Sequence, residues 1–144
     1  MSQFSGTNQL TMDDKGRLAI PARLRTQIGD EYGKAIVMTL GPECIEVYPV
    51  PVFRRKAEAI PKMQDREKRT LMLRLFVGYA VECEPDAQGR VLVPPALRER
   101  KLQANDVVLV GQLDHFELWT EAEWNSATVA SQPSYADAYA ALNL

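Results

Sequence analysis

The segment Asp13-Asp14-Lys15-Gly16-Arg17-Leu18-Ala19-Ile20-Pro21 returns 73 positions later (86 minus 13) as Asp86-Ala87-Gln88-Gly89-Arg90-Val91-Leu92-Val93-Pro94. Between segments 13–25 and 86–98, six of thirteen positions are identical. Further along the chain the shift becomes 71 (116 minus 45), and residues 45–48 match residues 116–119. A match that continues in the same order predicts an internal duplication, and the fold expected for the chain follows from it.

Each copy predicts the same succession of turn, strand and helix. Gly16 and Gly89 can adopt a positive φ at low cost, as a tight turn requires. Pro21 and Pro94 end the following apolar strand and suit the first turn of a helix, where no backbone N–H is needed. We therefore expect short helices at 21–28 and 94–102, followed by strand pairs at 35–40 with 44–48 and at 106–111 with 115–119.

Neither copy is expected to be stable alone, because a unit of roughly 45 residues buries too little surface. The two copies should therefore close one core together and cover each other's strand edges. The sequence predicts an α+β fold, mainly β, in which two internal repeats form a pseudo-twofold β barrel with flanking helices.

The remaining segments differ in character from the duplicated ones. We divide the chain into repeat 1 at 7–53, a helical connector at 54–80, repeat 2 at 81–124 and a C-terminal tail at 125–144. The connector predicts helices at 51–59 and 65–80, and the apolar stripe of the second is expected to pack on the barrel. This stripe consists of Leu71, Met72, Leu75, Phe76, Tyr79 and Ala80. The tail predicts a last helix at 134–142, which could dock or fray.

Composition and charge restrict the class of protein. With 144 residues, 46% of them hydrophobic and 25% charged, the chain resembles one ordinary globular domain and is too short for a large two-domain enzyme. We find no membrane-spanning apolar run and no signal-peptide pattern at the start, so we expect a cytoplasmic protein. A net charge of −2 argues against coating nucleic acid by bulk charge. Cations nevertheless cluster at Arg17, Arg23, Arg25, Arg54, Arg55, Lys56, Arg66, Lys68, Arg69 and Arg74.

The cysteines and the histidine do not form an obvious catalytic pattern. Cys44 and Cys83 are expected to be reduced core residues, and His115 occupies the strand position equivalent to Cys44. A zinc site built from these three side chains is an alternative, although they lack the close pairs typical of zinc ligands. We find no nucleophile elbow or phosphate-binding glycine loop, and expect no enzyme, cofactor, metal or small-molecule substrate.

The matched Asp-x-x-Gly-Arg turns resemble those of the MraZ family, a bacterial relative of the AbrB and SpoVT swapped-hairpin transcription factors. The resemblance covers nearly the whole chain, to about Trp124, and includes 44–49, 110–112 and 116–119. It implies a regulator, expected to repress, of the bacterial cell-division and cell-wall gene cluster, including its own operon. It also implies binding to short direct repeats in double-stranded promoter DNA, a ring-like homo-oligomer and association with the nucleoid. The family commonly begins Phe-Arg-Gly, whereas this chain has Phe4-Ser5-Gly6, so no role of that arginine is carried over.

The resemblance implies that the Asp-x-x-x-Arg motif of each repeat binds DNA, which selects Asp13 with Arg17 and Asp86 with Arg90. A guanidinium held out from a turn offers a planar fork of donors to phosphate oxygens or to the edge of guanine. The aspartates can only accept, so we expect them to hold the turn and orient the arginines. Lys15 adds a charge that the second copy lacks.

Simpler interpretations remain beside this one. Each Asp–Arg pair could be a surface ion pair around a glycine turn. Arg25 and Arg98 could serve only the dipoles of the short helices. The aromatic residues Tyr48, Phe53, Trp119 and Trp124 lie at matching places in both copies and suit core or subunit packing, but would also suit a protein-interaction module without direct DNA contact.

Overall fold

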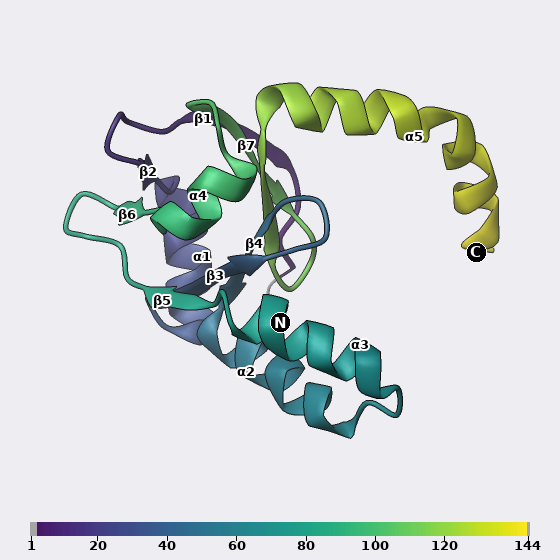
Figure 1. Cartoon of the computed structure of the whole chain (residues 1–144). Coiled ribbons are helices and arrows are strands. Elements are labelled where there is room, and N and C mark those ends of the chain that lie inside the picture. The colour runs from purple at the N-terminus through teal and green to yellow at the C-terminus, as the bar shows by residue number, and fades with distance from the viewer. Residues whose placement is uncertain (1–2, 144) are drawn as a thin grey trace.

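The computed structural model describes residues 3–143; Met1, Ser2 and Leu144, the last residue of the expected tail, lie outside the described residues. The chain runs twice through the order β-β-α-β-β-α (Figure 1). The first pass comprises β1 (Thr7–Thr11), β2 (Arg17–Ala19), α1 (Ala22–Tyr32), β3 (Ile36–Leu40), β4 (Ile45–Pro49) and α2 (Val50–Ala59). The second comprises β5 (Val81–Cys83), β6 (Arg90–Leu92), α4 (Pro95–Lys101), β7 (Asp106–Gly111), β8 (Phe116–Thr120) and α5 (Glu121–Ala141). The predicted α+β class is confirmed.

The helices and strands predicted from the duplicated motif are present. Helices α1 and α4 each begin directly after the proline that ends the motif, Pro21 and Pro94. The strand pairs β3–β4 and β7–β8 lie within one residue of the predicted ranges.

The two repeats exchange strands. The first strand of each repeat pairs with the third strand of the other, β1 with β7 and β5 with β3, in a six-stranded antiparallel sheet of order β1-β7-β8-β4-β3-β5. The remaining strands form a separate two-stranded ribbon, β2 with β6. In that ribbon Arg17 lies opposite Leu92 and Ala19 lies opposite Arg90. In the duplication Arg17 corresponds to Arg90 and Ala19 to Leu92, so both pairs join the same two positions of the motif. The pairing is therefore pseudo-twofold; closure of the sheet into a barrel stays a prediction.

The core lies between the ribbon, the sheet and the short helices. Leu18 and Val91 alternate with the outward residues of the ribbon and are 0% and 2% exposed. Leu24 of α1 and Leu97 of α4 are 1% and 0% exposed and belong to the same hydrophobic cluster. Equivalent residues of both repeats thus fill one core, as a half-size unit requires.

The connector differs from the single helix predicted at 65–80. Asp65 caps α3 (Arg66–Leu71) by accepting the Lys68 N–H at 3.0 Å, and the chain then becomes π-helical at Met72–Val77. A π-helix bonds from residue i to i+5, so it does not keep the stripe expected for a 3.6-residue period. Of the predicted stripe, only Phe76 is buried, whereas Leu71, Met72 and Leu75 are 54%, 36% and 43% exposed. The expectation that this stripe packs on the body therefore holds for Phe76 and the partly buried Tyr79 and is wrong for Leu71, Met72 and Leu75.

The tail is more regular than predicted. Helix α5 begins at Glu121, where the Thr120 side chain caps it, and continues past the expected boundary at 125 to Ala141. None of its residues is buried, and it contains Pro133. Figure 1 shows α5 leaving the body and bending in its second half, as an internal proline favours. Among the described residues, no helix combines the length and the apolar content needed to cross a membrane.

Candidate nucleic-acid interface

The first candidate turn is built by one carboxylate. Asp13 Oδ1 accepts hydrogen bonds from the backbone N–H groups of Lys15 at 3.0 Å and Arg17 at 2.8 Å. The backbone closes the same turn, with the Asp13 N–H bonded to the Arg17 carbonyl at 2.9 Å and the Gly16 N–H to the Asp13 carbonyl at 2.9 Å. Gly16 has φ +84°, a conformation that a side chain would strain.

The second turn repeats this construction. Asp86 Oδ1 accepts from the N–H groups of Gln88 and Arg90, both at 2.9 Å, and Gly89 has φ +78°. The duplicated sequence therefore folds into two equivalent turns. The role expected for the aspartates within the turns is present in the structure.

Each aspartate also fixes the arginine that follows it. Arg17 Nε donates to Asp13 Oδ2 at 2.7 Å, and Arg90 Nε donates to Asp86 Oδ2 at 3.2 Å. The side chains of Arg17 and Arg90 remain 37% and 34% exposed. The structure therefore shows the ion pairs of the simpler interpretation, but it also shows guanidinium groups that are held in place and still open to solvent.

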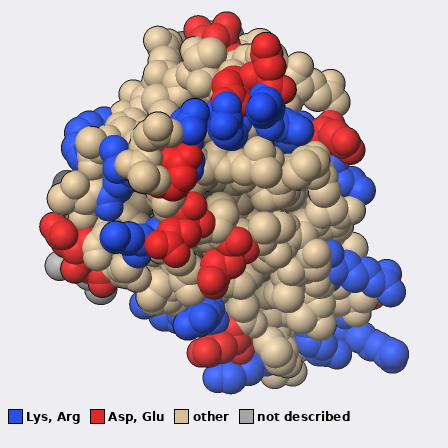
Figure 2. Space-filling view, turned by 90° about the vertical axis from the view of Figure 1, so that its left-hand side faces the viewer, with Lys and Arg blue, Asp and Glu red and all other residues tan. Residues whose placement is uncertain are grey.

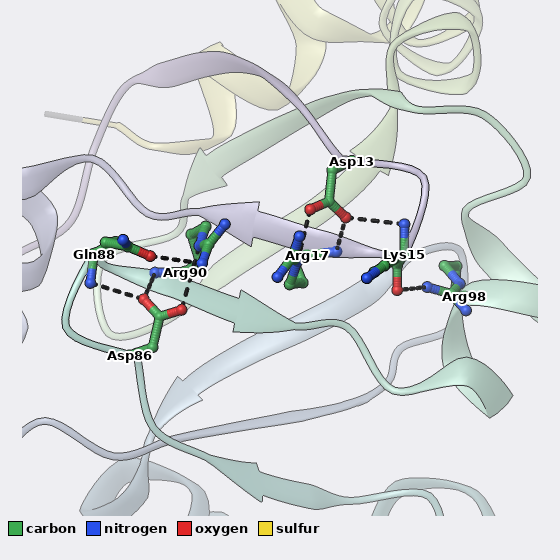
Figure 3. Close-up of polar contacts among 7 residues, drawn as sticks. All are labelled: Asp13, Lys15, Arg17, Asp86, Gln88, Arg90 and Arg98. Atoms are coloured by element: carbon green, nitrogen blue, oxygen red, sulfur yellow. Dashed lines mark hydrogen bonds and ion pairs between the residues drawn. The ribbon is translucent and has the colours of Figure 1, made fainter.

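Both arginines lie on one face. In the alternating pattern of the ribbon, Arg17 and Arg90 share the side opposite the buried Leu18 and Val91. Figure 3 shows the two arginines beside one another across β2 and β6, with the two turns at opposite ends of the ribbon. Figure 2 views this side of the molecule and shows basic and acidic side chains interspersed rather than a continuous basic surface. Binding here would depend on placed arginines more than on bulk charge.

The two turns differ in how free their arginines are. Arg90 Nη2 donates to Gln88 Oε1 at 2.6 Å. Within residues 3–143, no hydrogen bond in the structure engages the terminal nitrogens of Arg17, and Lys15 beside it is exposed. The first turn therefore has more donors available to a ligand.

Arg25 and Arg98 have a role that sequence reasoning missed. Arg98 Nη1 donates to the Lys15 carbonyl at 2.7 Å, and its guanidinium occupies the space that a side chain on Gly16 would fill. Arg25 lies in the same way against Gly89. Each short helix thus supports the turn of the other repeat. The only signal in the sequence is that both arginines belong to the duplicated motif, since their contacts depend on strand exchange.

We expect Gly16→Ala to destabilise the protein. An added Cβ would overlap Arg98 Nη1, so the arginine must move and give up its hydrogen bond to the Lys15 carbonyl. The positive φ adds a cost of about 1–2 kcal/mol for a residue with a Cβ. Urea unfolding should report a lower free energy of unfolding.

The control is Gly29→Ala in α1, where an added Cβ meets no atom within 4 Å. This variant should be about 0.5–1 kcal/mol more stable than the wild type, because alanine favours a helix interior. Equal effects at the two glycines would contradict the packing described for the turn.

The turn carboxylates predict a dependence of stability on pH. The backbone N–H of Arg17 is the main cause that lowers the pKa of Asp13 below its ordinary 3.8, and that of Arg90 does the same to the pKa of Asp86. A carboxyl whose pKa is lower in the folded than in the unfolded state stabilises the fold at pH values above its ordinary pKa. This contribution is lost as the pH falls through the lower pKa of the folded state. Replacing Asp13 and Asp86 together by asparagine should therefore lower the urea midpoint at pH 7, and the difference from the wild type should shrink below about pH 4. Asp30→Asn, an exposed change in α1, is the control; a pH-independent difference would contradict the assignment.

The other reactive side chains are placed unlike a catalytic site. Cys44 is buried and Cys83 is half-buried, and neither is in a disulfide. Burial raises the pKa of both thiols, that of Cys83 to about 11, so both are protonated at neutral pH. His115 stacks on Tyr48 at 4.7 Å and bonds to Asp114 at 2.7 Å. Within residues 3–143, no group of three or more His, Cys, Asp or Glu side chains is arranged to hold a metal ion.

Comparison with known proteins gives a consistent result over both repeats. The family model "MraZ protein, putative antitoxin-like" matches residues 3–74 and 76–142, one turn in each segment. A transcriptional regulator MraZ from Methylococcus capsulatus is 39% identical over 126 residues, 85% of this chain and 82% of the relative. Its counterpart from Marinobacter nauticus is 41% identical over 137 residues, 91% and 90% of the two chains. That from Thioalkalivibrio sulfidiphilus is 44% identical over 125 residues, 84% and 82%.

Proposed function

The chain belongs to the MraZ family of transcriptional regulators, and we propose that it binds promoter DNA in a sequence-specific manner through its two glycine turns. The proposed target is a set of short direct repeats upstream of its own operon, in the cell-division and cell-wall gene cluster. The proposed effect is repression, by a homo-oligomer associated with the nucleoid in the cytoplasm.

One observation supports this proposal most strongly: Arg17 and Arg90 lie on a common exposed face, and each is tied to a turn carboxylate. Guanidinium groups fixed in this way lose little freedom when they bind, and their geometry suits phosphate or a guanine edge. Lys15 adds a phosphate contact at the first turn. Asp13 and Asp86 are positioning residues, because an ionised carboxylate cannot donate to phosphate.

Several such sites would need to act together. A chain of net charge −2 with interspersed charges on this face offers weak electrostatic attraction to DNA. If several copies in one assembly meet successive repeats, linked binding raises the affinity by about 10² to 10⁴ without any new type of contact. The oligomer is therefore part of the proposed mechanism.

Footprinting of the upstream region tests the proposal. The wild type should protect regularly spaced repeats, and the protection should weaken at the higher of two salt concentrations. Arg17→Ala should lose protection at an unchanged oligomer mass, whereas Arg54→Ala removes an exposed arginine of α2 and should retain it. Equal protection by both variants would reject the assignment of the first turn. A wild type that protects no repeat would favour the protein-interaction module instead.

A further inference from the structure

The two repeats differ at the point where the first strand of each leaves the sheet. Strand β1 pairs with β7 up to Thr11, two residues before the turn carboxylate Asp13. Strand β5 pairs with β3 only up to Cys83, three residues before Asp86. The pairing in repeat 2 therefore stops one residue earlier, and segment 84–87 runs from the sheet to the second turn without it.

One difference within the duplicated motif accounts for the early end. Met12 of repeat 1 corresponds to Pro85 of repeat 2. The Met12 N–H donates to the Asn105 carbonyl at 2.8 Å, and the Met12 side chain is 3% exposed in the hydrophobic core. Proline has no N–H, so segment 84–87 lacks the equivalent bond to the carbonyl of Lys34, the counterpart of Asn105. The proline ring is also shorter than a methionine side chain and leaves the equivalent space in the core unfilled.

A cavity of about 350 Å³ lies along segment 84–87, all four residues of which line it. This volume is within the usual range of small-molecule sites, about 300–1,000 Å³. The apolar side chains of the lining come from both repeats and belong to the hydrophobic core; they are Ile20, Ile28, Ile36, Val47, Leu109 and Phe116. The cavity therefore reaches into the core that the two repeats share.

The polar part of the lining carries two cations with donors available to a ligand. Arg25 Nε donates to a backbone carbonyl at 3.0 Å, and Lys34 is exposed. Among the described residues, no hydrogen bond or ion pair engages Lys34 or the terminal nitrogens of Arg25. Of the two acids in the lining, Asp86 has both carboxylate oxygens bonded within its own turn, whereas Glu84 is exposed. Two available cations against one available acid favour a ligand with an anionic group.

We propose that this cavity binds a small amphipathic carboxylate, with its hydrocarbon chain among the core side chains and its carboxylate on Arg25 and Lys34. The apolar lining stabilises the chain in proportion to the area removed from water. The two cations hold the carboxylate by charge-assisted hydrogen bonds. In repeat 1 the side chain of Met12 takes the place of the ligand, so each chain has one such site.

The ligand also acts on the second turn, a step that rests on the proposed DNA-binding function. The guanidinium of Arg25 packs against Gly89, where an added Cβ would meet Arg25 Cζ at 2.5 Å. A carboxylate that draws Arg25 towards the cavity removes this support and adds a negative charge beside Asp86, which holds Arg90. Both effects weaken the contact of Arg90 with phosphate. We expect the bound carboxylate to lower the affinity for promoter DNA about fivefold or more, and DNA to lower the affinity for the carboxylate by the same factor.

Titration calorimetry with octanoate, in the absence of DNA, tests the site. The wild type should bind one octanoate per chain, and the affinity should rise about fourfold for each methylene added from hexanoate onwards, until the chain outgrows the cavity. Lys34→Gln changes an exposed residue, so the fold should survive. This variant should bind octanoate about tenfold more weakly and octanol as the wild type does, because octanol carries no charge for Lys34 to meet.

Filling the cavity is the second arm of the test. Pro85→Met restores the residue of repeat 1 and should abolish octanoate binding without lowering the urea midpoint. The matched control, Ala96→Met, adds the same side chain at an exposed position of α4 outside the lining and should bind octanoate as the wild type does. A wild type that takes up no octanoate, or several per chain, would overturn the inference. So would wild-type affinity in a folded Pro85→Met or in Lys34→Gln, and the Lys34→Gln result decides alone if Pro85→Met does not fold.

DNA binding is scored separately, by fluorescence anisotropy with and without saturating octanoate. Octanoate should weaken promoter binding by the wild type and by Ala96→Met, and leave that by Pro85→Met unchanged. If octanoate binds as expected and no protein binds the promoter, the proposed DNA function fails and the site stands. If the promoter is bound and octanoate is not, the site fails and the function stands. Equal promoter affinity with and without bound octanoate would reject the coupling to the second turn.

Discussion

Replacing Arg17 and Arg90 together by alanine is expected to weaken binding to the promoter by about 30-fold or more for one subunit. Each arginine contact with a phosphate or a base contributes about 1–3 kcal/mol, so two of them sum to at least about 2 kcal/mol. In an assembly the losses of several subunits combine, which makes this the largest change of affinity that the structure predicts. Fluorescence anisotropy with the repeat-containing duplex measures it.

The matched control removes the same charge elsewhere. Arg54 and Arg55 are exposed on α2, away from the ribbon, and their double alanine variant should bind within a few-fold of the wild type. The affinity of the Arg17 and Arg90 double variant for DNA should also depend less steeply on salt. The slope of the logarithm of the binding constant against the logarithm of the salt concentration should fall by about one unit for each phosphate that the protein no longer neutralises. Equal losses of affinity in the two double variants would indicate that only net charge matters.

Leu18→Ala is expected to lower the free energy of unfolding by about 2–5 kcal/mol, the usual cost of removing a buried leucine side chain. Leu18 is fully buried at the centre of the β2–β6 ribbon, opposite Val91, where the two repeats meet. The change therefore affects the core shared by both repeats rather than one of them. Urea unfolding should show a single transition at a lower midpoint.

Leu92→Ala provides the comparison within the same ribbon. Leu92 is 51% exposed on the outer face, so the same substitution should change the free energy of unfolding by less than about 0.5 kcal/mol. The pair tests the alternation that directs Arg17 and Arg90 outward. Similar destabilisation at Leu18 and Leu92 would mean that the ribbon does not have one buried and one exposed face.

The duplicated motif was sufficient to predict most local structure, because its signals are local. A glycine that adopts positive φ, an aspartate that bonds the next N–H groups and a proline before a helix act within a few residues. These signals predicted both turns, both short helices and the α+β class. The position of Arg17 and Arg90 on one face follows from the strand alternation once the two copies are paired.

The remaining features depend on contacts between distant residues. The support of Gly16 by Arg98 requires the exchange of strands between repeats, which spacing alone does not reveal. The connector departs from its predicted packing because the 3.6-residue period does not hold across Met72–Val77, where the helix is of the π type. The exposed leucines that result from it are visible only in the folded chain.

Photo-cross-linking shows whether the outer face of the ribbon contacts DNA. Ala19 is exposed on that face and lies opposite Arg90, so a benzophenone amino acid at this position should cross-link to promoter DNA. The same amino acid in place of Val129, which is 68% exposed on α5, should not. Cross-links from position 19 that form on the repeat-containing duplex are the result predicted here. Cross-links from position 129 and none from position 19 would contradict the assignment of the ribbon as the DNA-binding face.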